Sequence, residues 1–263
     1  MASCLKTTPI FYPLTNSTKS QVSSHQNRRW KISVLKRNRG RAAVVQCSAT
    51  ASDGELRILQ EGLGQNGYLT RGFGWGVRRM ERVEDEMRRV ADVQAEAFHE
   101  PAALFNDFFF EFFKAEVLSA LIYRIRNSPP DRYACLVTES INNESNSQGI
   151  PELVGVVDVT VQREDDVLQH LQGAREYLYV SGIAVLIKFR RQKIATVLLE
   201  ACNVLSEQWG YEYLALRAHE DDSAAQRLYT KAGYRVVSRD PHWITWVGKK
   251  RRVLMIKHSR TSR

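Results

Sequence analysis

Apolar residues between positions 77 and 126 change from strand-like to helix-like spacing. Residues 77–83 predict a first strand. Glu84-Asp85-Glu86 then predicts a helix start, because acidic side chains are favourable beside the partial positive charge of a helix N-terminus. Pro101 begins a second predicted helix, which runs to about Arg126. Its aromatic stripe is expected to pack on a sheet, or alternatively to line part of a binding channel, and comprises Phe105, Phe108, Phe109, Phe112 and Phe113.

Strand-like and helix-like runs then alternate to the end of the chain. Strands are predicted at 133–137, 153–161 and 177–187, and the polar stretch 142–149 is typical of a hairpin loop. A helical period follows and ends at Gly210, a typical C′ residue. A strand at 211–218 precedes a short helix, which Ser223-Ala224-Ala225-Gln226 opens as a capping box and Gly233 closes. With strands at 234–238 and 251–257, the order predicts an α/β fold with a mixed sheet flanked by helices.

The net charge of +9 over 263 residues is concentrated in the first 50 residues. These carry nine Lys and Arg side chains and no acid, and the first acidic residue is Asp53. The remaining chain is therefore neutral, which argues against nucleic-acid binding by the folded part. A hydrophobic content of 43% with 25% charged residues excludes global disorder.

Residues 1–50 have the composition of a targeting peptide: rich in Ser, Thr, Lys and Arg, and without an apolar core of the secretory kind. We expect residues 1–47 to be a chloroplast transit peptide removed near Cys47, which places the product in the stroma. Residues 48–75 form a poorly defined segment, in which the glycines around Phe73 predict a turn, and residues 76–263 form the folded domain. The alternative is a disordered basic tail that binds RNA or a membrane.

Two cysteines remain after residue 47, Cys135 and Cys202, and neither lies in a Cys/His cluster. The sequence therefore predicts no metal site and no disulfide framework. No apolar run approaches the roughly 20 residues that a membrane span needs, so no membrane insertion is expected.

A basic loop, Lys188-Phe189-Arg190-Arg191-Gln192-Lys193, joins a predicted strand to the helix that begins at Ile194. Backbone N–H groups at a helix N-terminus, with cationic side chains beside them, form an anion site suited to a diphosphate. The alternative is a solvated basic turn.

Two segments together carry a resemblance to a known family. Arg190-Arg191-Gln192-Lys193-Ile194-Ala195 resembles the Arg/Gln-x-x-Gly-x-Gly/Ala motif of the GNAT superfamily of acyl-CoA-dependent N-acetyltransferases. Its second motif, Asn-x-x-Ala-x-x-Leu-Tyr-x-x-x-Gly-Phe/Tyr, is matched from Asp222 to Tyr234. Lys193 replaces a glycine, and a lysine with negative φ could still offer its N–H group. Asp222 replaces an asparagine and keeps a helix cap.

The resemblance implies a GNAT-like fold with a mostly antiparallel sheet, acetyl-CoA as co-substrate and no metal. It also assigns site residues. Hydrogen bonds to the pantetheine arm are implied for Ile183, Ala184 and Val185. Contacts to the diphosphate are implied for the loop amides of Arg191, Gln192, Lys193, Ile194, Ala195 and Thr196, with further contacts near Asp222, Ser223 and Ala224. Tyr229 is implied as the general acid.

The chemistry of amide formation supports these roles. A neutral amine attacks the thioester carbonyl, and the developing oxyanion needs backbone donors, which we expect near Val185. The leaving thiolate needs a proton, which the phenol of Tyr229 can give, although a buried tyrosine is also a common core residue. His219 and Glu220 are candidates for a general base; His219 could equally be a solvated loop residue.

The sequence thus predicts an acetyl-CoA-dependent protein N-acetyltransferase of the plastid, acting on N-terminal α-amines and lysine ε-amines of plastid proteins, with no nucleic-acid or membrane partner. One alternative is an N-acetyltransferase for a small arylalkylamine of the serotonin type. Another is a CoA-binding regulator without turnover, because Lys193 and Asp222 depart from the motifs. A nucleic-acid binder would depend on the basic tail alone. The oligomeric state stays open.

Overall fold

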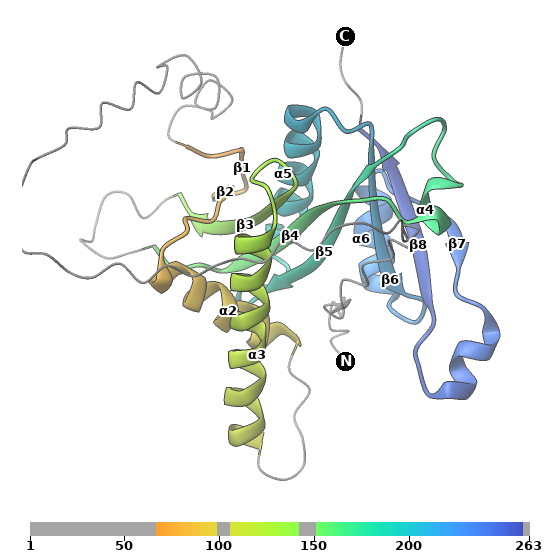
Figure 1. Cartoon of the computed structure of the whole chain (residues 1–263). Helices are drawn as coiled ribbons and strands as arrows, with labels where there is room; N and C mark the ends of the chain where they lie inside the picture. Colours follow the sequence, from red (N-terminus) through yellow and green to blue (C-terminus); the bar gives the residue numbers. More distant parts are fainter. Residues whose placement is uncertain (1–66, 99–105, 142–150, 260–263) are drawn as a thin grey trace, which may run out of the picture.

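The computed structural model describes residues 67–98, 106–141 and 151–259. Within them, eight strands form one sheet in the order β1-β2-β3-β4-β5-β6-β8-β7 (Figure 1). All neighbours are antiparallel except β5 and β6, so the predicted mixed, mostly antiparallel sheet is confirmed. The strands are β1 (Thr70–Gly72), β2 (Trp75–Arg79), β3 (Tyr133–Ser140), β4 (Gly155–Gln162), β5 (Tyr177–Val185), β6 (Tyr213–His219), β7 (Arg235–Arg239) and β8 (Arg252–His258).

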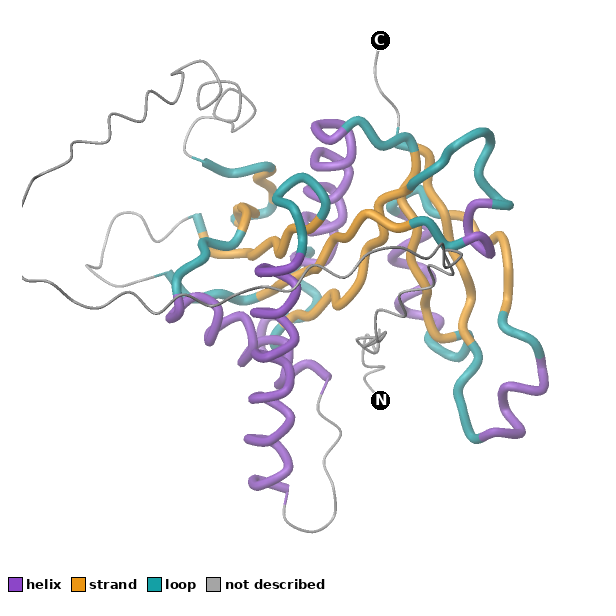
Figure 2. Tube along the Cα trace, viewed as in Figure 1, coloured by secondary structure: helices purple, strands orange, loops and turns teal. Residues whose placement is uncertain are grey.

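Helices cover both faces of the sheet (Figure 2). They are α2 (Glu84–Phe98), α3 (Asn106–Asn127), α4 (Asp165–Leu168), α5 (Ile194–Trp209) and α6 (Ser223–Lys231), with 3₁₀ turns η1 (Ile187–Phe189) and η2 (His242–Val247). One core packs α5 and α6 on the sheet through residues such as Leu198 and Tyr229. A second core packs α2 and Leu121 of α3 on the opposite face. Within the described residues, we find no helix with the length and apolar character of a membrane span.

The alternation of side chains between the two faces of the sheet is interrupted halfway along strand β5. Leu178 and Val180 face α5, as do Ile183 and Val185, so the interval between core positions lengthens from two residues to three. The extra residue is a bulge opposite Val157, next to the pair of Asp158 with Ser181, and Gly182 in this bulge has a φ of 60°. A positive φ suits glycine because it has no Cβ to clash. Because of the bulge, the side chains in the second half of β5 point to the opposite faces from those that the alternation in the first half would give them.

The predicted elements are present with shifted ends. Strand β2 ends at Arg79 rather than at 83, because the chain turns before α2 and the backbone N–H of Glu81 donates to Glu86. The run predicted as a strand to residue 187 ends at Val185 and continues into η1. The predicted turn around Phe73 joins β1 to β2, so part of the segment left undefined at 48–75 belongs to the sheet. The start of α3 at Pro101 and the loop 142–149 lie outside the described residues.

The caps of two helices correct one prediction and confirm another. Gly210 is left-handed with a φ of 75° and ends α5 as expected. The capping box at Ser223 is wrong, because Asp222 is the N-cap of α6 and its Oδ1 accepts from the backbone N–H groups of Ala224 and Ala225. The side chain of Gln226 instead donates to the carbonyl groups of His219 and Glu220, which ties α6 to the end of β6.

The hydrogen-bonded pairing of the sheet is shortest between the parallel strands β5 and β6. Only Leu178 with Leu214 and Tyr179 with Ala215 are paired, although both strands continue beyond them. Backbone groups in the second half of β5 therefore face away from β4 without a strand opposite them. This part of the sheet borders a cavity.

Candidate functional site

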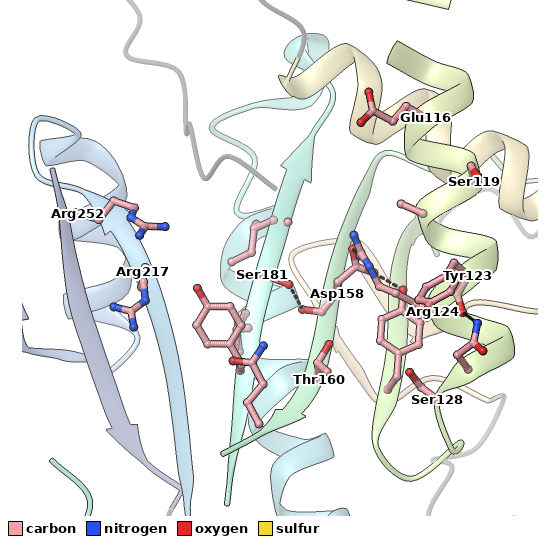
Figure 3. A pocket seen from close by; sticks show the side chains of 18 of the residues that line it. Glu116, Ser119, Tyr123, Arg124, Ser128, Asp158, Thr160, Ser181, Arg217 and Arg252 are labelled. Atoms are coloured by element: carbon pink, nitrogen blue, oxygen red, sulfur yellow. Dashed lines mark hydrogen bonds and ion pairs between the residues drawn. The ribbon is translucent and has the colours of Figure 1, made fainter. Parts of the chain in front are cut away.

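A cavity of about 630 Å³ opens where β5 and β6 separate (Figure 3). Its walls come from both faces of the sheet. Val180 and Ile183 of β5 and Tyr229 of α6 belong to the core beneath α5. On the opposite face the walls are Arg217 and His219 of β6, Arg252 of β8, α3 side chains between Phe112 and Asn127, and Ser128 just after α3. The cavity thus passes through the sheet between its two halves, and two reactants could meet in it from opposite faces.

Tyr229 is the predicted site residue that lies deepest in this cavity wall. It is 1% exposed and sits at the point where α6 faces β5. Its ring meets that of Tyr234 edge to face, with the centroids 6.2 Å apart. Tyr234 does not line the cavity, although its hydroxyl is buried. Of these two neighbouring phenols, only Tyr229 is placed to meet a ligand.

His219 lines the same cavity from the end of β6. It is half-buried, and burial lowers the pKa of its imidazole, assisted by the nearby charges of Lys250 and Arg252 and opposed by Asp221 and Asp222. A lowered pKa keeps the ring neutral at pH 7, which is the form that can accept a proton. Glu220, the other predicted base candidate, forms ion pairs with Arg239 and Arg251 and does not line the cavity.

A buried carboxylate lies at the other side of the cavity, in β4. Asp158 is 3% exposed and pairs with Ser181, directly beside the β5 bulge. Its Oδ2 accepts from Gln94 at 2.9 Å and from Arg124 at 2.8 Å, and its Oδ1 accepts from Tyr133 at 2.7 Å. Burial raises the pKa of Tyr133 well above its ordinary value, so the phenol remains a donor. The Asp158 network therefore joins α2, α3, β3 and β4 beside the bulge, and Figure 3 shows its Asp158 and Arg124 side chains.

Two arginines on the β6–β8 side bring positive charge to the cavity, and both have partners. Arg217 forms ion pairs with Glu164, at 3.4 Å, and with Asp166. Arg252 forms an ion pair with Asp240 at 3.3 Å. These pairs leave little uncompensated charge on this wall, and the rest of the lining combines aromatic and apolar side chains with polar ones such as Thr160 and Gln162.

The basic loop and the N-terminus of α5 follow β5 directly. Arg191, Gln192 and Lys193 are exposed, and residues 186–199 contain four basic side chains and no acid. Lys193 has a φ of 67° and Arg191 a φ of 68°, so the case of a lysine with negative φ considered from the sequence does not occur here. Lys193 adopts the left-handed conformation that a glycine would take here.

Two expected amide donors of this region are occupied. The N–H of Thr196 donates to the carbonyl of Lys193 at 3.0 Å, which closes the first turn of α5. The N–H of Ala224 donates to the Asp222 carboxylate, so the negative charge of Asp222 lies at the N-terminus of α6, the helix that it caps. Ser223 is exposed, whereas Ile194 is buried in the core and Ala195 is partly buried against it.

The cavity brings together Ile183, His219 and Tyr229 but not all of the predicted residues. Ala184 and Val185 are buried in the cores on opposite faces of the sheet and do not line it. Phe112 is 66% exposed at the cavity edge, so at this position the alternative of a channel lining fits and packing on the sheet does not. Sequence reasoning missed Asp158 and Arg124, because their pairing depends on strand register and on the position of α3.

A family model for acetyltransferases of the GNAT family matches residues 98–234, which span α3 to the end of α6. A relative from Arabidopsis thaliana, GCN5-related N-acetyltransferase 10, chloroplastic, is 60% identical over 192 residues, which cover 72% of this chain and 75% of the relative. The chain belongs to the GNAT family of acetyltransferases. The name of this GNAT relative also supports a plastid location, as the composition of residues 1–50 predicts.

Solved structures confirm the GNAT fold. Arabidopsis thaliana NAA60 in complex with acetyl-CoA is 16% identical, with a TM-score of 0.51 over 70% of this chain and 98% of that chain. The NatC complex bound to Gag peptide and CoA is 16% identical, with a TM-score of 0.50 over 70% of this chain and 98% of that chain. At these identities the likeness establishes the fold and no more.

Proposed function

We propose that this GNAT acetyltransferase transfers the acetyl group of acetyl-CoA to amines of plastid proteins, both N-terminal α-amines and lysine ε-amines, with Tyr229 as general acid. The observation that carries the proposal is the cavity that passes between β5 and β6 with Tyr229 in its wall. A thioester from one face and an amine from the other can meet there. Tyr229 lies on the α6 side, where a leaving thiolate would need its proton.

The residues present fit acetyl-CoA. The register of β5 with β6 ends at Tyr179 and Ala215, and the space beside the second half of β5 suits an extended pantetheine arm. The left-handed loop at Arg191–Lys193 and the start of α5 combine backbone N–H groups with exposed cationic side chains, which suits a diphosphate. Bound acetyl-CoA would supply an acyl thioester, the electrophile for amine attack.

Within this proposal, each of two side chains moves one proton. His219, neutral at pH 7, accepts the proton that the attacking nitrogen loses as its bond to the acetyl carbon forms. The Tyr229 hydroxyl donates a proton to sulfur as the carbon–sulfur bond breaks, and regains one after the products leave. The β5 bulge lines the cavity at Gly182, and backbone N–H groups there could donate to the carbonyl oxygen as its negative charge develops.

The α3 side of the cavity supports a protein acceptor. Its edge is lined by Phe112 and Tyr123, which are 66% and 53% exposed. An exposed aromatic edge leaves room for the residues that follow a reacting amine. Since Arg217 and Arg252 are paired with carboxylates, the wall does not select a strongly charged acceptor. This arrangement favours broad use of protein amines over one small arylalkylamine.

The proposal includes the domain organisation. Residues 1–47 act as a chloroplast transit peptide that delivers the enzyme to the stroma, residues 48–75 remain as an N-terminal segment whose end contributes β1 and Trp75 to the sheet, and residues 76–263 form the rest of the acetyltransferase domain. Its support is the acid-free basic leader and the chloroplastic relative. Sequencing the N-terminus of the protein isolated from chloroplasts tests the boundary, and a terminus far from residue 48 would contradict it.

The test is acetylation of a proteome-derived peptide library by the full chain with acetyl-CoA, read by mass spectrometry. We expect acetyl groups on peptide N-termini and on lysines, at levels well above a Tyr229→Phe control. The same reaction with serotonin in place of peptides covers the small-amine alternative. Acetylation of serotonin alone would overturn the protein acceptor, whereas CoA binding without any product would favour the regulator.

A further inference from the structure

The loop before α5 holds two non-glycine residues in the left-handed conformation. Arg191 and Lys193 have φ values of 68° and 67°, with Gln192 between them. This conformation is unfavourable for residues with a Cβ, because the Cβ comes too close to a backbone carbonyl. Lys193 also occupies the position of the motif glycine. Contacts from elsewhere in the chain must therefore maintain the loop in this shape.

Trp75 makes such a contact at the centre of the loop. Its indole Nε1–H donates to the carbonyl oxygen of Gln192 at 3.0 Å. The donor is fixed in place, because Trp75 is 8% exposed and its strand β2 pairs with β1 on one side and with β3 on the other. A loop shape that turned the Gln192 carbonyl away would leave this N–H without its acceptor.

The β1–β2 hairpin supports both flanks of the loop. The Nζ of Lys193 lies 5.9 Å from the ring centroid of Phe73, within cation–π range. The ring of Phe189, just before the loop, meets Trp75 edge to face at 5.8 Å. At Gly72 an added Cβ would lie 3.5 Å from Val197, so the hairpin also rests on the first turn of α5.

We infer that Trp75 is a positioning residue for the loop at Arg191–Lys193. Its hydrogen bond to Gln192 maintains the left-handed backbone conformation, which a glycine at position 193 would adopt without such support. The inference rests on the proposed function, in which this loop binds the diphosphate of acetyl-CoA. It assigns the β1–β2 hairpin, which lies outside the matched family region, a role in cofactor affinity.

The test begins with Trp75→Phe, which removes the indole N–H and keeps an aromatic ring. We expect the Kd for CoA and the KM for acetyl-CoA to rise about five- to tenfold, as for loss of one hydrogen bond, with kcat within about twofold. The matched control is Trp209→Phe, which makes the same chemical change at the far end of α5. It should leave the Kd for CoA unchanged. Thermal unfolding checks that both variants fold.

Lys193→Gly distinguishes positioning from a general structural effect. Glycine adopts the left-handed conformation without strain, so Lys193→Gly relieves one of the two strained positions, Arg191 being the other, and the loop depends less on Trp75. In the Lys193→Gly background, Trp75→Phe should change the Kd for CoA by less than about twofold. An undiminished effect in that background, or an unchanged Kd for Trp75→Phe alone, would overturn the inference.

Amide hydrogen exchange of the cofactor-free chain tests the same contact without CoA. Trp75→Phe should speed exchange at residues 191–195 relative to wild type and Trp209→Phe. If Trp75→Phe speeds exchange but the wild-type chain does not bind CoA, the role of Trp75 in loop shape stands and the proposed function is overturned. Unchanged exchange would overturn the inference even if the enzyme is active.

Discussion

Gly182 lies against the carboxylate of Asp158: a Cβ at Gly182 would stand 3.2 Å from the Oδ2 atom of Asp158. The two residues belong to neighbouring strands, and the β5 bulge sits directly over the Asp158 network. Because Oδ2 is also bonded to Gln94 and Arg124, it cannot move aside without losing those partners. The shape of the cavity-lining part of β5 is therefore tied to a carboxylate one strand away.

Gly182→Ala should lower both stability and turnover. The φ of 60° is unfavourable for alanine, which costs about 1–3 kcal/mol, and the new methyl group would press on Asp158. Gly173→Ala is the control, because Gly173 has a φ of 74° with open space around it. Urea unfolding should show the larger loss for Gly182→Ala, with reduced kcat only in that variant. Equal losses would mean that Asp158 does not constrain the bulge.

Arg124→Gln should destabilise the chain by about 2–4 kcal/mol. The substitution leaves the Asp158 carboxylate buried with neutral donors only, and breaking a buried ion pair is costly. The control is Arg88→Gln, which removes an exposed pair with Glu84 and should cost less than about 0.5 kcal/mol. Denaturant midpoints of the two variants measure the difference. A small effect of Arg124→Gln would show that water compensates for the lost guanidinium.

Tyr229→Phe should lower kcat about 100-fold or more and leave the Kd for CoA within about twofold, because it removes only the proton donor. Tyr234→Phe is the matched control, one ring away and outside the cavity. The Tyr234 hydroxyl has no hydrogen-bond partner, so its removal should leave kcat unchanged and not lower the melting temperature. Steady-state kinetics with calorimetric CoA binding separate these outcomes. Similar kcat values for the two variants would refute the acid role.

The pH dependence of kcat should report the protonation of the His219 imidazole. Burial lowers its pKa below 6.5, so the neutral, proton-accepting form persists to lower pH than for a free histidine, and activity should fall only below that value. Lys250→Ala removes a charge that lowers this pKa, so the falling limb should move to higher pH. His219→Asn should abolish the limb. A limb that survives in His219→Asn belongs to another group.

Periodicity predicted most of the fold, because long apolar runs report burial directly. The helix ended by Gly210 and the strands at 153–161 and 177–187 are confirmed within a few residues. The three-residue strand β1 was missed, because so short a strand carries no alternation and exists only through its pairing with β2. The motifs placed Ile183, His219 and Tyr229, which the fold brings to one cavity.

Features that depend on contacts between distant segments could not be predicted. The left-handed φ of Lys193 follows from Trp75, which lies more than a hundred residues earlier. The β5 bulge needs Asp158 to be known as its neighbour, and the position of Asp158 follows from strand register. The capping prediction failed at Ser223 because Asp222, one residue earlier, has the stronger acceptor and lies closer to the helix amides.

The two-residue pairing of β5 with β6 has a consequence for the lifetime of the protein. Strands β1–β5 and β6–β8 share only that short backbone seam, so the two halves of the sheet depend on the covering helices to stay together. Acetyl-CoA bound as proposed would contact both halves of the sheet and hold them together. At a concentration of 100 times its Kd, it would add about 2.7 kcal/mol to the free energy of unfolding. A plastid poor in acetyl-CoA would thus lose this enzyme to proteolysis sooner, which couples the amount of catalyst to the supply of its own acyl donor.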